Sequence, residues 1–212
     1  MPEFRTEPLI VPTVSGLLPA GERERRIALT SFHAGEERAQ VPMRDVVCYE
    51  CGEACRVPSA ALSANCIHCH AHLNMSDVVV RPGSRRLTVR TLGNVHVPAG
   101  TVLSNLSVVC HNMEVEGRVS GSFRCTGTLS INASMKVDGP ISAGRLVVDK
   151  GVELELEVGA VAESVDLFGR LKGRLQCKGG LHIYRSGSYE GVCKAADVVV
   201  DPGGQYDNQS RF

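Results

Sequence analysis

The chain has 212 residues and equal numbers of basic and acidic residues, 23 of each, so its formal net charge is zero. A neutral chain has no overall attraction for nucleic acid, and it also lacks the charge repulsion that keeps identical molecules apart. Aromatic residues make up only 4% and Trp is absent, whereas Val, Leu and the 22 Gly are abundant. This mixture favours strands and tight turns over helices.

Residues 1–45 are predicted to form a disordered tail, because five prolines and clusters of charge interrupt any helical or strand period. Short apolar pieces at 9–11, 17–18 and 27–29 are either incidental in a linker or a docking peptide for a partner or a membrane surface. No secretory signal is visible, and no apolar run approaches the ~20 residues of a membrane-spanning helix. We therefore expect a cytoplasmic protein whose tail can touch the inner face of the membrane.

Residues 46–76 contain two Cys-x-x-Cys knuckles, formed by Cys48 with Cys51 and by Cys66 with Cys69. In a reducing compartment clustered cysteines more often bind a metal than form disulfides. Two knuckles brought together offer four thiolates in a tetrahedron, which suits Zn²⁺, and four thiolates leave no open position for catalysis. The pattern resembles a zinc ribbon and predicts a structural zinc ion. A redox role is less favoured, because a redox Cys-x-x-Cys normally stands alone at the start of a helix.

Other potential ligands lie beside the knuckles, namely Cys55, His68, His70 and His72. Any one of them can replace a knuckle cysteine, although such residues are more often bystanders or hydrogen-bond donors to a ligand. The module is expected either to bind a partner or to cap the N-terminal end of the domain that follows.

Residues 77–212 carry an internal repeat, because tight-turn residues recur every 16 to 18 positions, at Gly83, Gly100, Gly117, Ser134, Gly151, Gly169, Gly187 and Gly203. Most of them follow an alternating apolar segment, and residues 78–83 and 198–203 are nearly the same hexapeptide. At ~3.3 Å per residue, a repeat of this length makes three short strands and three corners. The sequence therefore predicts an all-β fold, a parallel β-helix whose triangular coils stack on one another.

Two other architectures compete with this one. The strands of a β-sandwich recur every ~8–12 residues without a longer register. The regular spacing of the turn residues therefore argues against a β-sandwich. A left-handed β-helix of the acyltransferase type shows six-residue repeats, and no six-residue register can be traced here. The right-handed form is therefore favoured.

Residues 78–208 resemble the bactofilins, a family of bacterial cytoskeletal proteins. The resemblance is carried by Val-Glu-Gly-Arg-Val-Ser-Gly at 115–121, Val-Asp-Gly-Pro-Ile-Ser-Ala at 137–143 and Val-Val-Val-Asp-Pro-Gly at 198–203. It implies a right-handed parallel β-helix and filaments built end to end without nucleotide, often beneath the membrane. It also implies a scaffold for wall synthesis or cell shape, whose partners are other copies of itself and cell-wall or membrane-associated proteins.

The ends of a β-helix expose unpaired backbone groups and the edge of the core, which invites stacking of subunits. We expect the contact surface at the C-terminal coil, formed by Val198, Val200, Tyr206 and Phe212. A second function class is a monomeric β-helix that displays the zinc ribbon to a protein or a nucleic acid. An enzyme is the third class, but the sequence shows no catalytic triad, phosphate loop or paired catalytic carboxylates.

We expect structural roles for the remaining polar and cysteine residues. The scattered cysteines at 110, 125, 177 and 193 are expected to be buried as small apolar residues. His96, His111 and His182 fall in different coils with no carboxylate at a fixed spacing. The glutamates at 153, 155 and 157 predict a solvated strand face, and the basic residues at 170, 172 and 174 either offset its charge or form a basic strip.

Overall fold

The structure, a computed structural model, describes residues 41–84 and 87–209. Most of the predicted tail at 1–45 lies outside the described residues, and so does Phe212. The described residues form strands and turns, and this part of the chain holds no helix of the length and apolarity that crossing a membrane requires.

The cysteine-rich part consists of two antiparallel hairpins. Strand β1 (Met43–Val47) pairs with β2 (Ala54–Pro58), and β3 (Ser63–Asn65) pairs with β4 (His72–Asn74). Each hairpin turn carries one knuckle, and the first strand begins three residues before the predicted start of the module. Two short hairpins bury little apolar surface, so their fold needs another source of stability.

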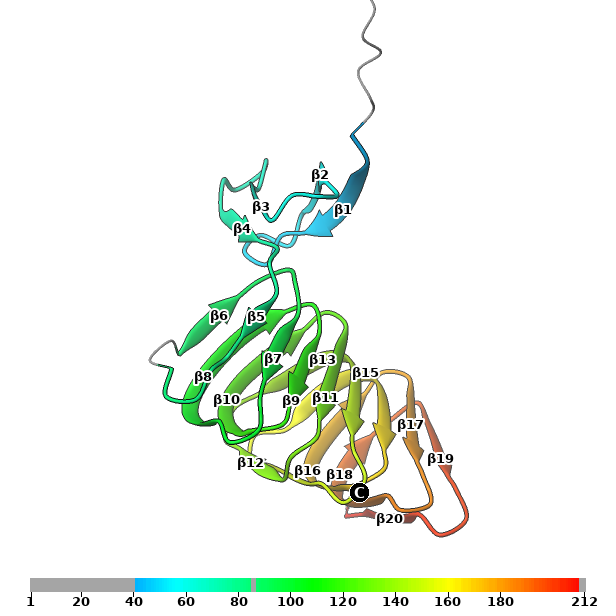
Figure 1. The fold of residues 1–212 in the computed structure, drawn as a ribbon. Coiled ribbons are helices and arrows are strands. Elements are labelled where there is room, and N and C mark those ends of the chain that lie inside the picture. Colours follow the sequence, from blue (N-terminus) through cyan, green and yellow to red (C-terminus); the bar gives the residue numbers. More distant parts are fainter. Residues whose placement is uncertain (1–40, 85–86, 210–212) are drawn as a thin grey trace, which may run out of the picture. The chain divides into compact units, whose positions relative to one another are not determined.

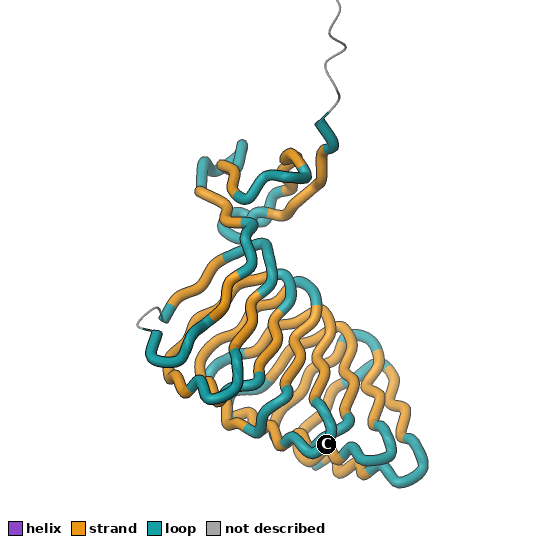
Figure 2. The backbone as a smooth tube through the Cα atoms, in the orientation of Figure 1, coloured by secondary structure: helices purple, strands orange, loops and turns teal. Residues whose placement is uncertain are grey.

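The rest of the described chain winds into parallel coils (Figures 1 and 2). The first face of the stack contains eight strands or strand ends, each parallel to the next. In order they are β5 (Val78–Val79), β7 (Val95–Val97), β9 (Met113–Val115), β11 (Thr128–Ile131), the ends of β13 (Ile141–Val148) and β15 (Ala160–Leu167), β17 (Gly180–Ile183) and β19 (Asp197–Val200).

Two further faces complete each coil. The second face is built by the starts of β8 (Val102–Cys110), β10 (Arg118–Cys125), β16 (Arg170–Cys177) and β18 (Ser188–Lys194), together with β12 (Met135–Val137), β14 (Glu153–Leu156) and β20 (Gln205–Asn208). The third face starts at β6 (Thr88–Arg90) and continues through the remaining halves of the long strands. The predicted fold class, a parallel β-helix preceded by a small cysteine module, is confirmed. The hand of the winding stays a prediction.

Inward side chains from successive coils form apolar ladders. On the first face one ladder consists of Val78, Val95, Met113, Leu129, Leu146, Val165, Leu181 and Val198. The spacing along this ladder varies from 16 to 19 residues, which is wider than the spacing of the turn residues. A coil buries its apolar residues only against the coils above and below, so stability accumulates with each neighbour.

The predicted turn residues all lie at one corner, between a first-face strand and the strand or segment of the second face. Two physical reasons place glycine there. Gly100 and Gly151 adopt the left-handed region, with φ of 81° and 76°, which glycine enters without a Cβ penalty. At Gly169 and Gly187 a Cβ would instead overlap a carbonyl oxygen of the preceding coil, that of Val152 or of Leu167. The recurring glycines at this corner therefore have two causes, the turn geometry at some positions and the close stacking of coils at others.

Candidate metal centre and assembly surfaces

The two knuckles bring four cysteine sulfurs together. The Sγ atoms of Cys48 and Cys69 are 3.7 Å apart, as are those of Cys51 and Cys66, and all four lie within 4.8 Å of one another. A tetrahedral zinc site with Zn–S bonds of ~2.3 Å places its sulfurs about 3.8 Å apart. The four side chains thus fit a tetrahedral thiolate site, and they are the four that the knuckle spacing predicts.

Backbone geometry prepares each knuckle for this role. The N–H of Gly52 donates to the carbonyl of Cys48 and the N–H of His70 donates to that of Cys66, both at 2.9 Å. Gly52 and His70 both have positive φ, 78° and 59°. His70 therefore adopts, in the second knuckle, the conformation that Gly52 adopts in the first, at the strain cost that a side chain brings there.

The surroundings of Cys66 favour its thiolate. The backbone N–H of Cys69 lowers the pKa of Cys66 to about 6 against the opposing effect of burial, and the N–H of His68 and the thiol of Cys55 assist. The Sγ atoms of Cys55 and Cys66 are 3.3 Å apart, and this contact raises the pKa of Cys55. Cys55 is therefore the protonated thiol of this contact, while Cys66 has the thiolate character that binding a metal ion requires.

The histidines near the knuckles lie outside the sulfur cluster. His68, His70 and His72 are exposed, and Nε2 of His68 contacts the carbonyl oxygen of Ala54 at 3.2 Å. The carbonyl of His72 accepts a hydrogen bond of 2.6 Å from the hydroxyl of Tyr49, which ties the two hairpins together. The side chains of His68 and Tyr49 thus help to position the knuckles.

The module is joined to the first coil at a single corner. The N–H of Leu92 donates to the carbonyl of Asn74 at 2.7 Å, and the hydroxyl of Thr91 donates to the carbonyl of Ser76 at 2.6 Å. The guanidinium of Arg90 forms an ion pair with Glu50. Leu92 also packs against the small core made by Cys48, Cys55, Cys66 and Leu73.

The two ends of the coil stack differ in the exposure of their inward residues. In the last coil Val200 is 41% exposed and Tyr206 37%, although both continue ladders whose interior members are buried. In the first coil Val80 and Val89 are each only 3% exposed. Both line a groove of about 370 Å³ with Val78, Val79 and residues 81–84. The predicted contact residues Val198, Val200 and Tyr206 therefore lie on an exposed end of the core.

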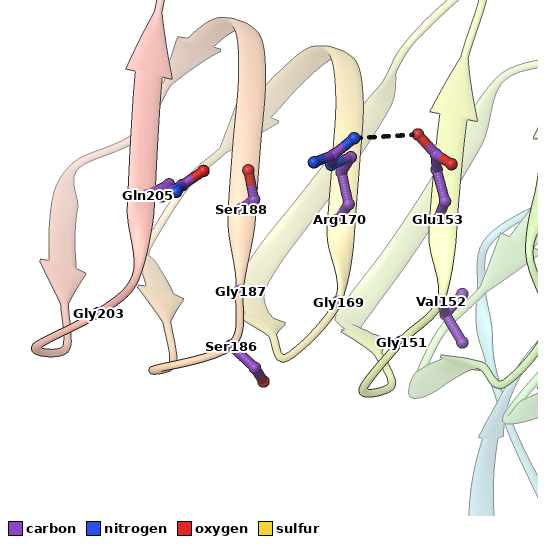
Figure 3. A pocket seen from close by; sticks show the side chains of 10 residues that line it. All are labelled: Gly151, Val152, Glu153, Gly169, Arg170, Ser186, Gly187, Ser188, Gly203 and Gln205. Atoms are coloured by element: carbon purple, nitrogen blue, oxygen red, sulfur yellow. Dashed lines mark ion pairs between the residues drawn. The ribbon is translucent and has the colours of Figure 1, made fainter.

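A second groove, of about 360 Å³, follows the glycine corner across four coils (Figure 3). Its floor is backbone, because Gly151, Gly169, Gly187 and Gly203 place no side chain there. Glu153, Arg170, Ser188 and Gln205 stand in a row along it, with Glu153 and Arg170 paired at 3.7 Å. The groove is a consequence of stacked glycines, and it is open and polar.

The family comparison bears on this stack. A bactofilin family model, described as polymer-forming cytoskeletal, matches residues 67–159. The chain carries a bactofilin domain. A search of the curated proteins and a search of the solved structures each found no match. The resemblance drawn from the sequence is confirmed, and the parallel ladder of this bactofilin domain continues past the matched segment to Asn208.

The outer surface of the bactofilin domain carries charges that pair between coils. Arg170 pairs with Glu153, and Lys172 with Glu190. Lys136 contacts both Glu155 at 3.3 Å and Glu157 at 2.9 Å. The expected offset of the acidic face by the basic row holds for Arg170 only, because Lys172 pairs with Glu190 and Lys136 contacts the other two glutamates.

Two of the three histidines have a carboxylate neighbour in the structure, although no carboxylate stands at a fixed spacing from them in the sequence. Nδ1 of His96 lies 3.4 Å from a carboxylate oxygen of Glu114, and Nε2 of His182 lies 3.0 Å from Oδ1 of Asp201. Each partner is about one coil further along the chain, 18 and 19 residues away. The coil repeat indicates that a partner lies about one coil away, but the coil length varies from 16 to 19 residues, so the repeat does not identify the partner.

The sequence did not predict a cluster of charged and aromatic residues that lies on the first face. Asp166 is nearly buried and accepts hydrogen bonds from Nε of Arg145 at 2.5 Å and from the hydroxyl of Tyr184 at 3.3 Å. The ring of Tyr184 stacks between those of Phe168 and His182. Because these residues come from successive coils, the contacts of the cluster stabilise the stacking of these coils.

The four cysteines of the bactofilin domain are buried, as predicted. Cys110 and Cys125 are neighbours on one ladder, with their Sγ atoms 3.5 Å apart. The hydrogen bond from Cys110, together with burial, raises the pKa of Cys125, so this thiol stays protonated.

Proposed function

We propose that this protein is a cytoplasmic scaffold that assembles end to end into filaments without nucleotide, and that its cysteine module holds one structural zinc ion. The observation that carries the proposal is the exposed inward ladder of the last coil, formed by Val198, Val200 and Tyr206. The bactofilin domain, described as polymer-forming cytoskeletal, supports it. Other copies of the chain are the primary partners, and cell-wall or membrane-associated proteins are further ones.

Assembly is driven by the physics that stacks coils within one chain. Strand β19 pairs only with β17, and β20 only with β18, so each has one outer edge without a strand partner among the described residues. Burying the inward residues against another subunit and pairing these edges both lower the free energy. Neither contribution requires nucleotide binding or hydrolysis.

Zinc is proposed because the four sulfurs have the spacing of a tetrahedral thiolate site. The ion would hold together two hairpins that have only a small core of their own. The module is further proposed to cap the corner of the first coil, because its hydrogen bonds and ion pair fall on Arg90, Thr91 and Leu92. Loss of zinc would then loosen this corner.

A second function, an adaptor that binds a partner through the module, is favoured by one observation. Leu62 and Ile67 are 70% and 69% exposed, and they precede and follow β3 in the sequence. Exposed large aliphatic residues on a small module suit a protein partner. A scaffold that recruits a partner through its module combines both functions.

Negative-stain electron microscopy of the purified full chain, with and without a zinc chelator, tests the proposal. Filaments or ribbons are expected without added nucleotide, and a change in their length or number on chelation would connect the module to assembly. Val200→Arg is expected to yield dispersed subunits, because it places a charge in the contact. Uniform small particles of the unaltered protein across concentrations and salt would overturn the scaffold and leave the adaptor.

A further inference from the structure

The paired strand segments of the third face carry basic residues and no acidic residue. These segments are Thr88–Arg90, Leu106–Cys110, Gly121–Cys125, Ile141–Ala143, Ala160–Ala162, Arg174–Cys177 and Val192–Lys194. Their charged residues are Arg90, Arg124, Arg174 and Lys194, and all of them are exposed. Because the chain as a whole is neutral, positive charge is concentrated on this side of the coil stack.

The alternation of the strands directs these charges to solvent. Successive side chains of a strand point to opposite faces, and Phe123 and Cys193, beside Arg124 and Lys194, are buried in the core. The register places one residue from each successive strand in a single outward row, formed by Arg90, Val109, Arg124, Ser142, Val161, Gln176 and Lys194. Since neighbouring strands lie ~4.8 Å apart, this row spans about 29 Å.

Most of the charge on this face is not neutralised within the chain. On the first and second faces, several basic residues pair with carboxylates of neighbouring coils. On the third face Arg90 pairs with Glu50 of the cysteine module, but Arg124, Arg174 and Lys194 form no ion pair within the described residues. Like charges on one surface repel one another, and a bound anionic partner relieves this repulsion.

Two adjoining grooves follow the row. One has a volume of about 210 Å³ and is lined by Arg90 and Arg124 together with Ser107, Ser122 and Ser142. The hydroxyl of Ser122 donates to that of Ser107 at 3.3 Å. The other groove, of about 340 Å³, has among its lining residues Arg124, Ser142, Val161, Glu163 and Lys178. The grooves share Arg124 and Ser142, so cationic and hydroxyl donors follow one another beside exposed valine.

The outward side chains favour an acidic protein segment over a nucleic acid or a membrane. Proteins that bind single-stranded nucleic acid stack its bases on aromatic rings, and proteins that lie on a membrane insert Trp, Phe or Leu. The aromatic residue of the third-face segments, Phe123, is 1% exposed, and their outward apolar residues are Val109, Val161 and Val192. Hydroxyl donors and small apolar residues instead suit a chain in which carboxylates alternate with small residues.

We propose that the third face is a docking surface for an extended acidic segment of a partner protein. The segment lies along the outward row, with carboxylates on Arg124 and Lys194 and at the corner of Lys178. An extended chain rises ~3.3 Å per residue, so about nine residues cover the row. The surface is a side of the stack and leaves both ends free, so docking does not depend on the proposed self-assembly.

A fluorescein-labelled peptide of four Glu-Val-Ser repeats tests the proposal with the full chain. Fluorescence anisotropy is expected to show binding at about 50 mM NaCl and weaker binding at about 300 mM, because salt screens exposed charges. The double variant Arg124→Glu/Lys194→Glu should bind the peptide at least tenfold more weakly. The neutral variant Arg124→Gln/Lys194→Gln should give a smaller loss.

A matched control reverses two exposed charges away from the third face, Arg118→Glu/Lys150→Glu, and changes the net charge by the same amount. Neither residue forms an ion pair among the described residues. This variant should bind the peptide within twofold of the unaltered protein. Urea unfolding of both double variants shows whether the coils remain folded.

Two comparison probes, a dT oligonucleotide of twelve nucleotides and vesicles with phosphatidylglycerol, identify the class of partner. If either binds through Arg124 and Lys194 while the acidic peptide does not, the face recognises phosphate and the proposed partner is wrong. Equal losses in the two double variants would mean general attraction of charge, and no binding of the peptide would also overturn the docking surface. Filaments of Arg124→Glu/Lys194→Glu should form as usual. Peptide binding by a protein that never forms filaments would refute the scaffold and leave this surface.

Discussion

The same substitution in one ladder distinguishes a residue of the core from a residue of the contact surface. Val148 and Val200 occupy equivalent inward positions, because each lies on the first-face ladder that also contains Ile131, Leu167 and Ile183. Val148 is 0% exposed and Val200 is 41% exposed. Truncation of each to Ala removes the same atoms from different surroundings.

The magnitudes follow from burial. Val→Ala removes two carbons worth ~0.8 kcal/mol each when buried, and a residual cavity adds to this, so Val148→Ala should cost about 2–3 kcal/mol. In a dispersed subunit Val200→Ala should cost only about 1 kcal/mol, because water already reaches the side chain. In the proposed assembly Val200 would be buried too, so about 1 kcal/mol more would be lost at each contact. That loss corresponds to a roughly fivefold higher critical concentration for assembly.

Urea unfolding below the critical concentration measures the loss of stability that each substitution causes in dispersed subunits. Pelleting over a concentration series measures the change in the critical concentration for assembly. Val148→Ala should mainly lower the unfolding midpoint, and Val200→Ala should mainly raise the critical concentration. Equal losses of stability in dispersed subunits would mean that the last coil is covered within the chain. An unchanged critical concentration for Val200→Ala would show that the contact lies elsewhere.

Three further predictions concern the metal centre, the coil contacts and the buried thiols. Cys66→Ser should lose the bound metal and Cys55→Ser should retain it, as measured by the ratio of zinc to protein, because Cys66 belongs to the sulfur cluster and Cys55 only contacts it. Gly191→Ala should destabilise the fold by more than ~2 kcal/mol, whereas Gly83→Ala should cost only ~1 kcal/mol, as judged by urea unfolding. The reason is that a Cβ at Gly191 would overlap the carbonyl of Gly173, while at Gly83 it meets nothing within 4 Å. Burial raises the pKa of Cys177 and Cys193 above the usual 9.0, so the contribution of these two thiols to stability should be constant below pH 9 and should fall as the pH rises beyond it, when unfolding lets them ionise. A urea midpoint that is equal at pH 8 and pH 10 would contradict this, and Cys177→Ala should flatten the decline.

The sequence by itself determined the repeating coil and the four-cysteine set. Turn residues and alternating apolar residues are local features, so their spacing along the chain reveals the coil before any contact is known. The knuckles are equally local, since a Cys-x-x-Cys turn places two thiolates together whatever surrounds it. These features therefore predicted the stack, the corner and the sulfur cluster.

Only the tertiary structure decided which side chains meet between coils. The coil length varies from 16 to 19 residues along one ladder, so counting along the chain does not give the neighbour of a particular residue. The pairing of His182 with Asp201, and the donation by Cys55 to Cys66, depend on this register and on the packing of two hairpins. Exposure at the two ends is likewise a property of the whole stack. Val80 and Val200 follow the same local sequence pattern, but the surrounding structure buries Val80 and leaves Val200 exposed.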